Sequence, residues 1–197
     1  MIAECSALIL AGGDSRRMGQ DKAGLVLDGR TLLQRVAATL QPLFAEVIVA
    51  VRQSRSDIAL PQVCDDPAHS GPLAGLVAGL ERAGTPWIFA VACDMPFIAA
   101  PLIEQLARQR AGCQAVVPVV RGCPQPLAAF YAKSCAGEAR RLLGSSGKHS
   151  LRALLDGIQV RYVDEAEMIE ADPQLRSFFD LDTPQDVALA MNREEAK

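Results

Sequence analysis

Short apolar runs alternate along this chain with segments in which apolar residues recur every three to four positions. Residues 46–51 and 87–93 are almost entirely apolar, which is typical of strands buried on both faces of a sheet. Between them, Leu73, Leu76 and Leu80 follow the spacing of one helix face. This alternation predicts an α/β fold with a mostly parallel sheet covered by helices on both faces, in three α/β/α layers.

The same pattern divides the chain into expected elements, and capping residues or prolines mark several helix starts. The expected strands span residues 7–10, 25–27, 46–51, 87–93, 115–120, 127–131, 160–163 and 178–181. The expected helices begin at Thr31, Pro72, Pro101, residue 134, Ser150 and Thr183. Ligands of such sheets bind at the carboxyl ends of the strands, so the residues that follow each strand are candidates for function.

The length and composition are those of one globular domain, which we expect to cover residues 1–197. Half of the residues are hydrophobic, 22% are charged, and the formal net charge is −3. Since no basic run of five residues occurs, nucleic acid is not an expected partner. No apolar run approaches the ~20 residues that a transmembrane helix needs, so no membrane association is expected.

The cysteines and the N-terminus bear on the cellular compartment. The six cysteines form no Cys-x-x-Cys pair, and their spacings match neither a zinc ribbon nor a disulfide scaffold. The first residues carry no basic segment followed by a long apolar stretch, so no signal peptide is expected. The sequence therefore predicts a cytoplasmic protein with reduced cysteines.

The residues that follow the first expected strand have the composition of a phosphate-binding loop. Residues 8–22 read Leu-Ile-Leu-Ala-Gly-Gly-Asp-Ser-Arg-Arg-Met-Gly-Gln-Asp-Lys. Gly12 and Gly13 allow backbone N–H groups to approach an anion, and Arg17 and Lys22 add positive charge. The stretch is neither a P-loop nor the Gly-x-Gly-x-x-Gly of dinucleotide-binding domains. A tight turn followed by solvated basic residues is the alternative.

Two expected strands end in carboxylates. Asp94 comes directly after the apolar run, while Asp180 and Asp182 lie two positions apart and would share one face of a strand. Mg²⁺ commonly takes one or two carboxylates together with the phosphates of a substrate. Asp94 is therefore the predicted Mg²⁺ ligand, with Asp182 as the second. The alternatives are that Asp94 caps a loop and that Asp182 only precedes a capped helix.

Several short motifs together resemble the molybdenum cofactor nucleotidyltransferases over nearly the whole chain. Residues 10–22 read Leu-Ala-Gly-Gly-x-Ser-x-Arg-Met-Gly-x-Asp-Lys. The Gly-Gly form is similar to the guanylyltransferase branch, whereas the cytidylyltransferase branch typically has Ala-Ala-Gly. The other motifs are Gly71-Pro72-Leu73-Ala74-Gly75, Cys93-Asp94-Met95-Pro96, Gln125-Pro126-Leu127 and Asp182-Thr183-Pro184. The combination is far more specific than any single motif.

The resemblance implies a Rossmann-like nucleotidyltransferase fold and a definite reaction. The enzyme would transfer GMP from Mg-GTP to molybdopterin or to the molybdenum cofactor and release pyrophosphate. The implied cofactor is Mg²⁺. The implied partners are GTP, the acceptor and, transiently, cofactor-insertion proteins or molybdoenzyme chaperones. The N-terminal half is expected to bind the nucleotide, and the C-terminal half the acceptor.

The motifs and the resemblance together assign roles to single residues. Lys22, Arg17 and Asp94 are the expected catalytic residues. The expected nucleotide contacts are Leu10, Ala11, Gly12, Gly13, Lys22, Asp66, Gly71, Gly75 and Asp94. The expected acceptor contacts are Gln125, Lys148, Ser150 and Arg152. The alternatives are a loop-forming role for Asp66, a packing role for the two later glycines, and simple solvation of the basic side chains.

Two positions depart from the guanylyltransferase pattern. Asp180-Leu181-Asp182 is closer to the cytidylyltransferase branch than to the asparagine-rich version expected for guanylyltransferases, and Ala50 stands where the latter often have asparagine. A CTP-dependent cytidylyltransferase is therefore one alternative function. A non-catalytic nucleotide-binding protein is another, although Lys22 and Asp94 are both present.

Overall fold

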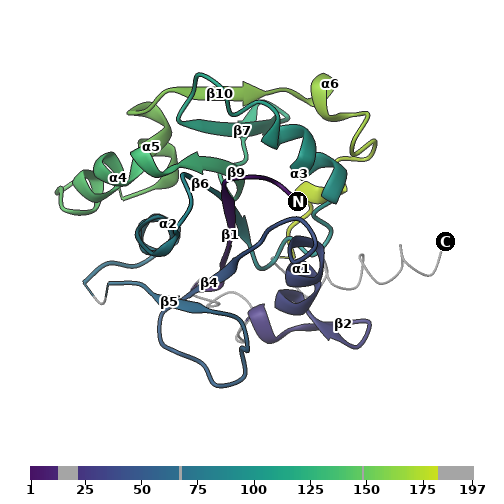
Figure 1. Cartoon of the computed structure of the whole chain (residues 1–197), viewed down its shortest axis with the longest axis horizontal. Coiled ribbons are helices and arrows are strands. Elements are labelled where there is room, and N and C mark those ends of the chain that lie inside the picture. The colour runs from purple at the N-terminus through teal and green to yellow at the C-terminus, as the bar shows by residue number, and fades with distance from the viewer. Residues whose placement is uncertain (13–21, 67, 148, 182–197) are drawn as a thin grey trace.

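The first apolar run forms the central strand of a sheet. The computed structural model describes residues 1–12, 22–66, 68–147 and 149–181. Strand β1 (Cys5–Leu10) lies between β4 (Val47–Val51) and β6 (Trp87–Ala92) and is parallel to both (Figure 1). These three strands are almost completely buried, because apolar side chains on both faces favour the middle of a sheet over its edge.

The main sheet has eight strands in the order β10-β7-β9-β6-β1-β4-β5, with β8 paired to β7. Strand β9 runs antiparallel to β6 and β7, whereas β4 and β5 are parallel, as are β7 and β10. The remaining strands are β5 (Gln62–Cys64), β7 (Ala115–Val120), β8 (Cys123–Pro124), β9 (Ala128–Ala132), β10 (Val160–Val163) and the hairpin of β2 (Val26–Leu27) and β3 (Arg30–Thr31). The mostly parallel sheet is confirmed.

The helices begin close to the residues that the sequence marks. Thr31 caps α1 (Leu32–Leu40) in a capping box, in which Thr31 Oγ1 accepts from Gln34 N at 3.1 Å. Ser150 Oγ accepts from Ala153 N at 3.2 Å and caps α5 (Leu151–Asp156). The other helices are α2 (Pro72–Arg82), α3 (Ala100–Ala107), α4 (Ala136–Leu143) and α6 (Glu165–Met168), with 3-10 turns at Lys22–Gly24, Lys133–Cys135 and Arg176–Phe178.

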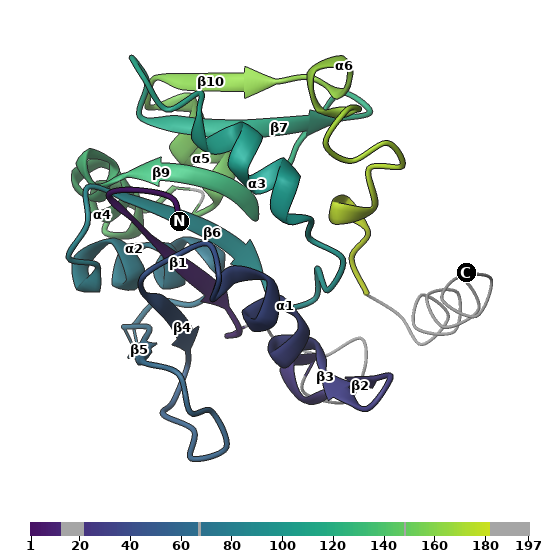
Figure 2. The same ribbon diagram turned by 45° about the vertical axis from the view of Figure 1, so that its right-hand side comes forward.

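Successive strand residues supply two separate cores, because their side chains point alternately to opposite faces of the sheet. In β1, Ala7 and Ile9 belong to the core beneath α1 and α3, whereas Leu8 belongs to the core beneath α2. Helices α1, α3 and α6 cover one face, and α2, α4 and α5 cover the other (Figures 1 and 2). The three-layer α/β/α architecture is therefore confirmed.

The C-terminal segment differs from the expectation. The sequence predicts a strand over residues 178–181, which is wrong: the chain makes the 3-10 turn Arg176–Phe178 and then runs irregularly to Leu181. The reason is local, because the buried Asp172 carboxylate accepts from the backbone N–H groups of Arg176 and Ser177 at 3.1 and 2.8 Å and holds the turn. The helix expected at Thr183 lies outside the described residues.

Candidate functional site

The carboxyl ends of β1 and β6 lie side by side. The last residue of β1, Leu10, pairs with Ala92 of β6, and beyond this pair Cys93 N donates to Leu10 O at 3.1 Å. Gly12 and Asp94 are each the second residue after these two strand ends. The structure therefore brings the start of the glycine loop and the predicted metal carboxylate to the same edge of the sheet, where ligands of such folds bind.

Part of the predicted site falls beyond what the structure describes. Gly13, Arg17, Lys148 and Asp182 lie outside the described residues. Lys22 begins the turn Lys22–Gly24, which leads from the glycine loop into the β2–β3 hairpin. The roles expected of these residues stay predictions.

A carboxylate that the motifs did not single out lies between the glycine loop and α2. Asp65 follows β5 directly and is buried. A Cβ built on Gly12 would lie 3.2 Å from Asp65 Oδ2, and one built on Gly75 would lie 3.4 Å from Oδ1. Burial raises the pKa of this carboxyl group above its ordinary value, while the charge of Arg52 opposes the shift. In the sequence, the only sign of this buried carboxylate is that two aspartates, Asp65 and Asp66, are adjacent.

Two glycines shape the start of α2. Gly71, at the N-cap position, has φ +99°, a backbone conformation that favours glycine. A Cβ on Gly75 would lie only 2.6 Å from Leu10 Cδ2 and 3.3 Å from Ala50 Cβ. Helix α2 therefore approaches the ends of β1 and β4 more closely than a larger residue at position 75 would allow. Gly75 thus allows close packing, whereas Gly71 provides the positive φ of the N-cap. The contact of both glycines with a nucleotide stays a prediction.

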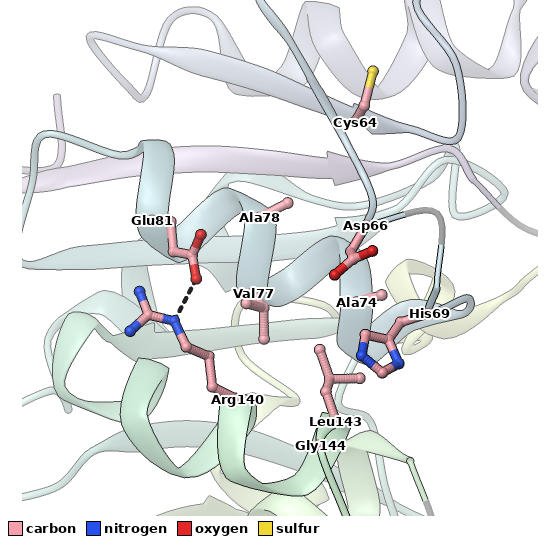
Figure 3. Close-up of a pocket in the computed structure, with 10 residues that line it drawn as sticks. All are labelled: Cys64, Asp66, His69, Ala74, Val77, Ala78, Glu81, Arg140, Leu143 and Gly144. Atoms are coloured by element: carbon pink, nitrogen blue, oxygen red, sulfur yellow. Dashed lines mark hydrogen bonds and ion pairs between the residues drawn. The ribbon is translucent and has the colours of Figure 1, made fainter.

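Asp66 has surroundings different from those of Asp65. It is exposed, its Oδ1 accepts from Ala68 N at 2.9 Å, and its carbonyl oxygen accepts from His69 N at 2.9 Å, as in a loop-forming Asp. Asp66 lines a cavity of about 420 Å³ between α2 and α4, which also contains His69 and Arg140 (Figure 3). Its predicted nucleotide contact is neither supported nor opposed by these bonds.

Asp94 is half-buried, and its loop is fastened by a distant segment. The Asp94 carbonyl oxygen accepts from Leu181 N at 2.9 Å. Leu181 is completely buried in a small apolar cluster. The other members of this cluster are Leu25, Leu27, Leu32, Phe97 and Phe179. Three segments therefore pack against one another in this cluster: the one that follows Lys22, the one that follows Asp94 and the one that precedes Asp182.

A second cavity of about 560 Å³ borders this cluster. Its walls combine aromatic rings, including Phe97 and Phe179, with the cationic side chains of Arg121 and Arg176. The guanidinium carbon of Arg176 lies 4.8 Å from the centre of the Phe97 ring. Gln125, an expected acceptor contact, also lines this cavity. Aromatic surface with a few fixed polar groups suits a flat heterocycle that carries an anionic substituent.

The expected acceptor contacts that the structure describes, Gln125, Ser150 and Arg152, belong to different parts of the fold. Gln125 lines the second cavity, whose Val120 packs against the core beneath α1 and α3. Ser150 instead caps α5, which packs through Leu151 into the core on the opposite face of the sheet. Arg152 is exposed on that same helix. Of the expected acceptor contacts that the structure describes, Gln125 alone borders the second cavity.

Comparison with known proteins identifies the family. Residues 7–164 match the sequence profile of the MobA-like NTP transferase domain. The chain belongs to the MobA-like NTP transferase family. It is a nucleotidyltransferase, as the resemblance implied.

Curated relatives extend the match over most of the chain. A probable molybdenum cofactor guanylyltransferase of Pelotomaculum thermopropionicum is 36% identical over 191 residues, which cover 95% of this chain and 92% of the relative. One from Opitutus terrae is 44% identical over 153 residues, which cover 73% and 75%. These identities confirm that the chain resembles the molybdenum cofactor guanylyltransferases.

Solved structures support the fold. A molybdopterin-guanine dinucleotide biosynthesis protein A from Archaeoglobus fulgidus superposes with a TM-score of 0.86 at 28% identity, covering 98% of this chain and 100% of that one. The 2-C-methyl-D-erythritol 4-phosphate cytidylyltransferase of Thermus thermophilus, at 24% identity and a TM-score of 0.68, shares the fold. In the described part of the chain, no helix has the length and apolar character needed to cross a membrane.

Proposed function

We propose that this nucleotidyltransferase transfers GMP from Mg-GTP to the phosphate of molybdopterin or of the molybdenum cofactor. The observation that carries the proposal is that the start of the glycine loop, Asp94 and the cavity beside Phe97 share one edge of the sheet. Relatives aligned over 95% and 93% of the chain are named for this reaction. A phosphate cradle, a metal carboxylate and an acceptor cavity side by side are what an in-line transfer requires.

The nucleotide end of the site uses the glycine loop. Backbone N–H groups of Gly12 and Gly13 cradle phosphate oxygens, and Arg17 and Lys22 neutralise the triphosphate. The N–H of Ala11, which the sequence also assigned to the cradle, instead donates to Ala50 O at 2.9 Å. The base and ribose lie against the ends of β1 and β5 and the start of α2. The residues proposed to contact them are Leu10, Asp66, Gly71 and Gly75.

The metal end of the site uses Asp94, with Asp182 as the second predicted ligand. Asp94 fits a hard divalent cation, because its half-buried carboxylate follows a central strand at the ligand-binding edge. When bound, Mg²⁺ offsets negative charge on the phosphate oxygens. The bond from Leu181 N to the Asp94 carbonyl oxygen keeps the Asp94 loop in position.

The chemistry requires no covalent enzyme intermediate. An oxygen of the acceptor phosphate forms a bond to the α-phosphorus of GTP while the bond from that phosphorus to the bridging oxygen of pyrophosphate breaks in line. A phosphate monoester is already an anion near neutral pH, so no strong general base is needed. The side chains therefore act by orienting the two phosphates and by neutralising their charge.

The acceptor end of the site is the cavity lined by Phe97, Gln125 and Arg176. Its aromatic rings suit the pterin, and the guanidinium groups of Arg121 and Arg176 suit the acceptor phosphate. Lys148, Ser150 and Arg152 remain predicted acceptor contacts; Ser150 caps α5 and Arg152 belongs to it, and α5 packs against the other face of the sheet. Transient contact with cofactor-insertion proteins or molybdoenzyme chaperones also remains a prediction.

The decisive experiment measures pyrophosphate release by the purified chain with Mg²⁺ and molybdopterin, comparing GTP with CTP at equal concentration. Release with GTP alone supports the proposal. Release with CTP alone instead supports the cytidylyltransferase alternative, which the Asp180-Leu181-Asp182 motif favours. Binding of GTP without release from either nucleotide supports a non-catalytic nucleotide-binding protein.

A further inference from the structure

The two histidines of the chain lie against each other, although they are far apart in the sequence. The ring centres of His69 and His149 are 5.9 Å apart, and the ring planes meet at 87°, an edge-to-face arrangement. Aromatic rings favour this geometry at centre-to-centre distances of about 4.5–7 Å. The contact therefore joins the β5–α2 connection, which carries His69, to the α4–α5 connection, which carries His149.

The β5–α2 connection belongs to the nucleotide end of the proposed site. His69 N donates to the carbonyl oxygen of Asp66 at 2.9 Å, and Gly71 follows as the N-cap of α2. Asp66 and Gly71 are both proposed nucleotide contacts. His69 is half-buried and lines the cavity between α2 and α4 together with Leu143 and Gly144, the last residue and the C-cap of α4 (Figure 3). This side chain therefore links the nucleotide end of the site to the end of α4.

The α4–α5 connection is braced by hydrogen bonds of its own. Ser145 Oγ donates to Leu142 O at 2.7 Å and accepts from Gly147 N at 3.3 Å. His149 Nε2 lies 2.6 Å from Ser145 O, and because a carbonyl oxygen only accepts, this ring nitrogen carries a proton and donates. Ser150, a predicted acceptor contact, follows His149 directly and caps α5. A contact that holds the His149 ring therefore also holds the chain that leads into Ser150.

Helices α2 and α4 pack side by side next to the histidine pair. Val77 and Leu143 belong to one apolar core, and Arg140 Nε donates to Glu81 Oε1 at 2.5 Å (Figure 3). These contacts fix the two helices but end where α4 ends. The histidine pair extends the contact from the helices to the two connections.

We propose that His69 and His149 are positioning residues that hold the α4–α5 connection against the β5–α2 connection and thereby strengthen binding of the acceptor. In-line transfer requires the acceptor phosphate beside the α-phosphate of GTP, so acceptor contacts have to lie close to nucleotide contacts. The ring contact provides this proximity for the segment that continues into Ser150. The inference rests on the proposed guanylyl transfer and adds two residues that act on the acceptor through their neighbours.

The test measures binding of the acceptor without transfer. Calorimetry on the full chain gives the Kd of molybdopterin with Mg²⁺ and a saturating α,β-methylene analogue of GTP, whose carbon bridge resists cleavage. We expect His69→Ala and His149→Ala each to raise this Kd about 3- to 10-fold, the loss of one aromatic contact. Both changes remove the same contact, so the double variant should bind no more weakly than the weaker single variant.

The nucleotide provides an internal reference in each variant. The turn from His69 N to Asp66 O and the N-cap at Gly71 use backbone atoms, which the alanine substitutions retain. We therefore expect the Kd of the GTP analogue, measured without molybdopterin, to stay within about twofold of the unmodified value. A merely structural role would weaken both ligands by one factor, and that result overturns the inference.

Two further variants are the controls. His69→Phe keeps an aromatic ring that can meet His149 edge-to-face, so the Kd of molybdopterin should return to within about twofold of the unmodified value. Arg140→Gln removes the ion pair with Glu81 between the same two helices and leaves both histidines in place. Its Kd should equal that of the unmodified chain. A loss as large as in His69→Ala would show that helix packing positions the connection, which overturns the inference.

The remaining outcomes separate a positioning role from a direct contact and from failure of the transfer. An unchanged Kd of molybdopterin in His69→Ala overturns the inference even where His149→Ala weakens binding, because His149 would then contact the acceptor by itself. Effects that multiply in the double variant also overturn it. If His149→Ala fails to fold, His69→Ala and His69→Phe still decide.

Pyrophosphate release by the unmodified chain is measured separately with GTP. The expected Kd values without any release contradict the proposed transfer and leave the positioning role intact. Release together with equal Kd values in all variants supports the transfer and overturns the positioning role. An unmodified chain that binds no molybdopterin overturns the inference as well.

Discussion

The backbone N–H of Leu181 donates to the carbonyl oxygen of Asp94 at 2.9 Å and joins the C-terminal segment to the loop of the predicted metal carboxylate. Leu181 is also completely buried against Leu27 and Leu32, next to Phe97. This apolar cluster therefore supports the chain segments next to three predicted charged residues of the site, Lys22, Asp94 and Asp182. Precise placement of such groups depends on the packing beneath them.

Leu181→Ala is expected to loosen the site as well as the fold. Truncating a fully buried leucine costs about 2–5 kcal/mol, because a cavity remains where the side chain packed. We expect a lower free energy of unfolding in urea, together with a lower kcat for pyrophosphate release and a higher Mg²⁺ requirement.

Val26→Ala is the control for that change, because Val26 belongs to the same hairpin as Leu27 but is 60% exposed. Its unfolding free energy should stay within about 0.5 kcal/mol of the original. A Leu181→Ala enzyme with reduced stability but an unchanged Mg²⁺ requirement would show that the cluster does not position Asp94.

Asp94→Ala is expected to abolish most of the turnover while leaving the fold intact. The half-buried carboxylate is the proposed Mg²⁺ ligand, and metal neutralisation of phosphate charge is worth several kcal/mol, so kcat should fall by about 10²-fold or more. The measurement is pyrophosphate release over a range of Mg²⁺ concentrations, with thermal unfolding recorded alongside. Unchanged turnover would refute the metal role.

The strands and caps of this fold are predictable because their signals are local. The apolar runs locate β4 and β6 to within a residue, and the hydroxyls of Thr31 and Ser150 mark two helix starts that the structure confirms. Strands β5 and β8 and helix α6 are not predictable in this way, since two to four residues are too few to establish a periodicity.

The candidate site is predictable only where it follows a strand end. Gly12 and Asp94 are predictable at the ligand-binding edge because each comes directly after an apolar run. The burial of Asp65 rather than Asp66 depends on how closely α2 approaches β1. This contact joins segments far apart in the sequence, so the residues around the doublet do not predict it. The same holds for the separation of Gln125 from Ser150 on opposite faces of the sheet.

Gly75→Ala is expected to destabilise the protein by about 1–3 kcal/mol, because the added methyl group overpacks the contact between α2 and β1. The new Cβ would lie 2.6 Å from Leu10 Cδ2, so Leu10→Ala in the same chain should recover part of the loss. Gly137→Ala in α4 is the control: a Cβ there meets nothing within 4 Å, and alanine should stabilise the helix by up to about 1 kcal/mol. The free energy of unfolding in urea is measured for the unmodified protein, Gly75→Ala, the double variant with Leu10→Ala, and Gly137→Ala. Equal changes in stability at both glycines would contradict the prediction.

Asp65 is expected to make the protein less stable as the pH rises. Burial raises its folded-state pKa above the unfolded value, so between the two values the folded chain binds more protons and the free energy of unfolding falls with increasing pH. Asp65→Asn lacks this titration. The free energy of unfolding of Asp65→Asn, relative to that of the unmodified protein, should therefore increase from about pH 4 upwards. The difference should level off once the Asp65 carboxyl of the folded protein is ionised. Urea midpoints of both proteins across this range test the sign, and a difference that shrinks with rising pH would contradict it.

The cysteines should divide into reactive and protected classes, although all six are free thiols. Cys64 and Cys123 are exposed, whereas burial raises the pKa of Cys5 to about 12 and that of Cys135 to about 11. Because the thiolate is the reactive form, N-ethylmaleimide at about pH 8 should modify Cys64 and Cys123 first and the half-buried Cys113 more slowly. Peptide mapping by mass spectrometry identifies the sites, with urea-unfolded protein as the fully labelled control. Early modification of Cys5 or Cys135 in the folded protein would mean that the core around β1 or α4 opens more readily than its packing indicates.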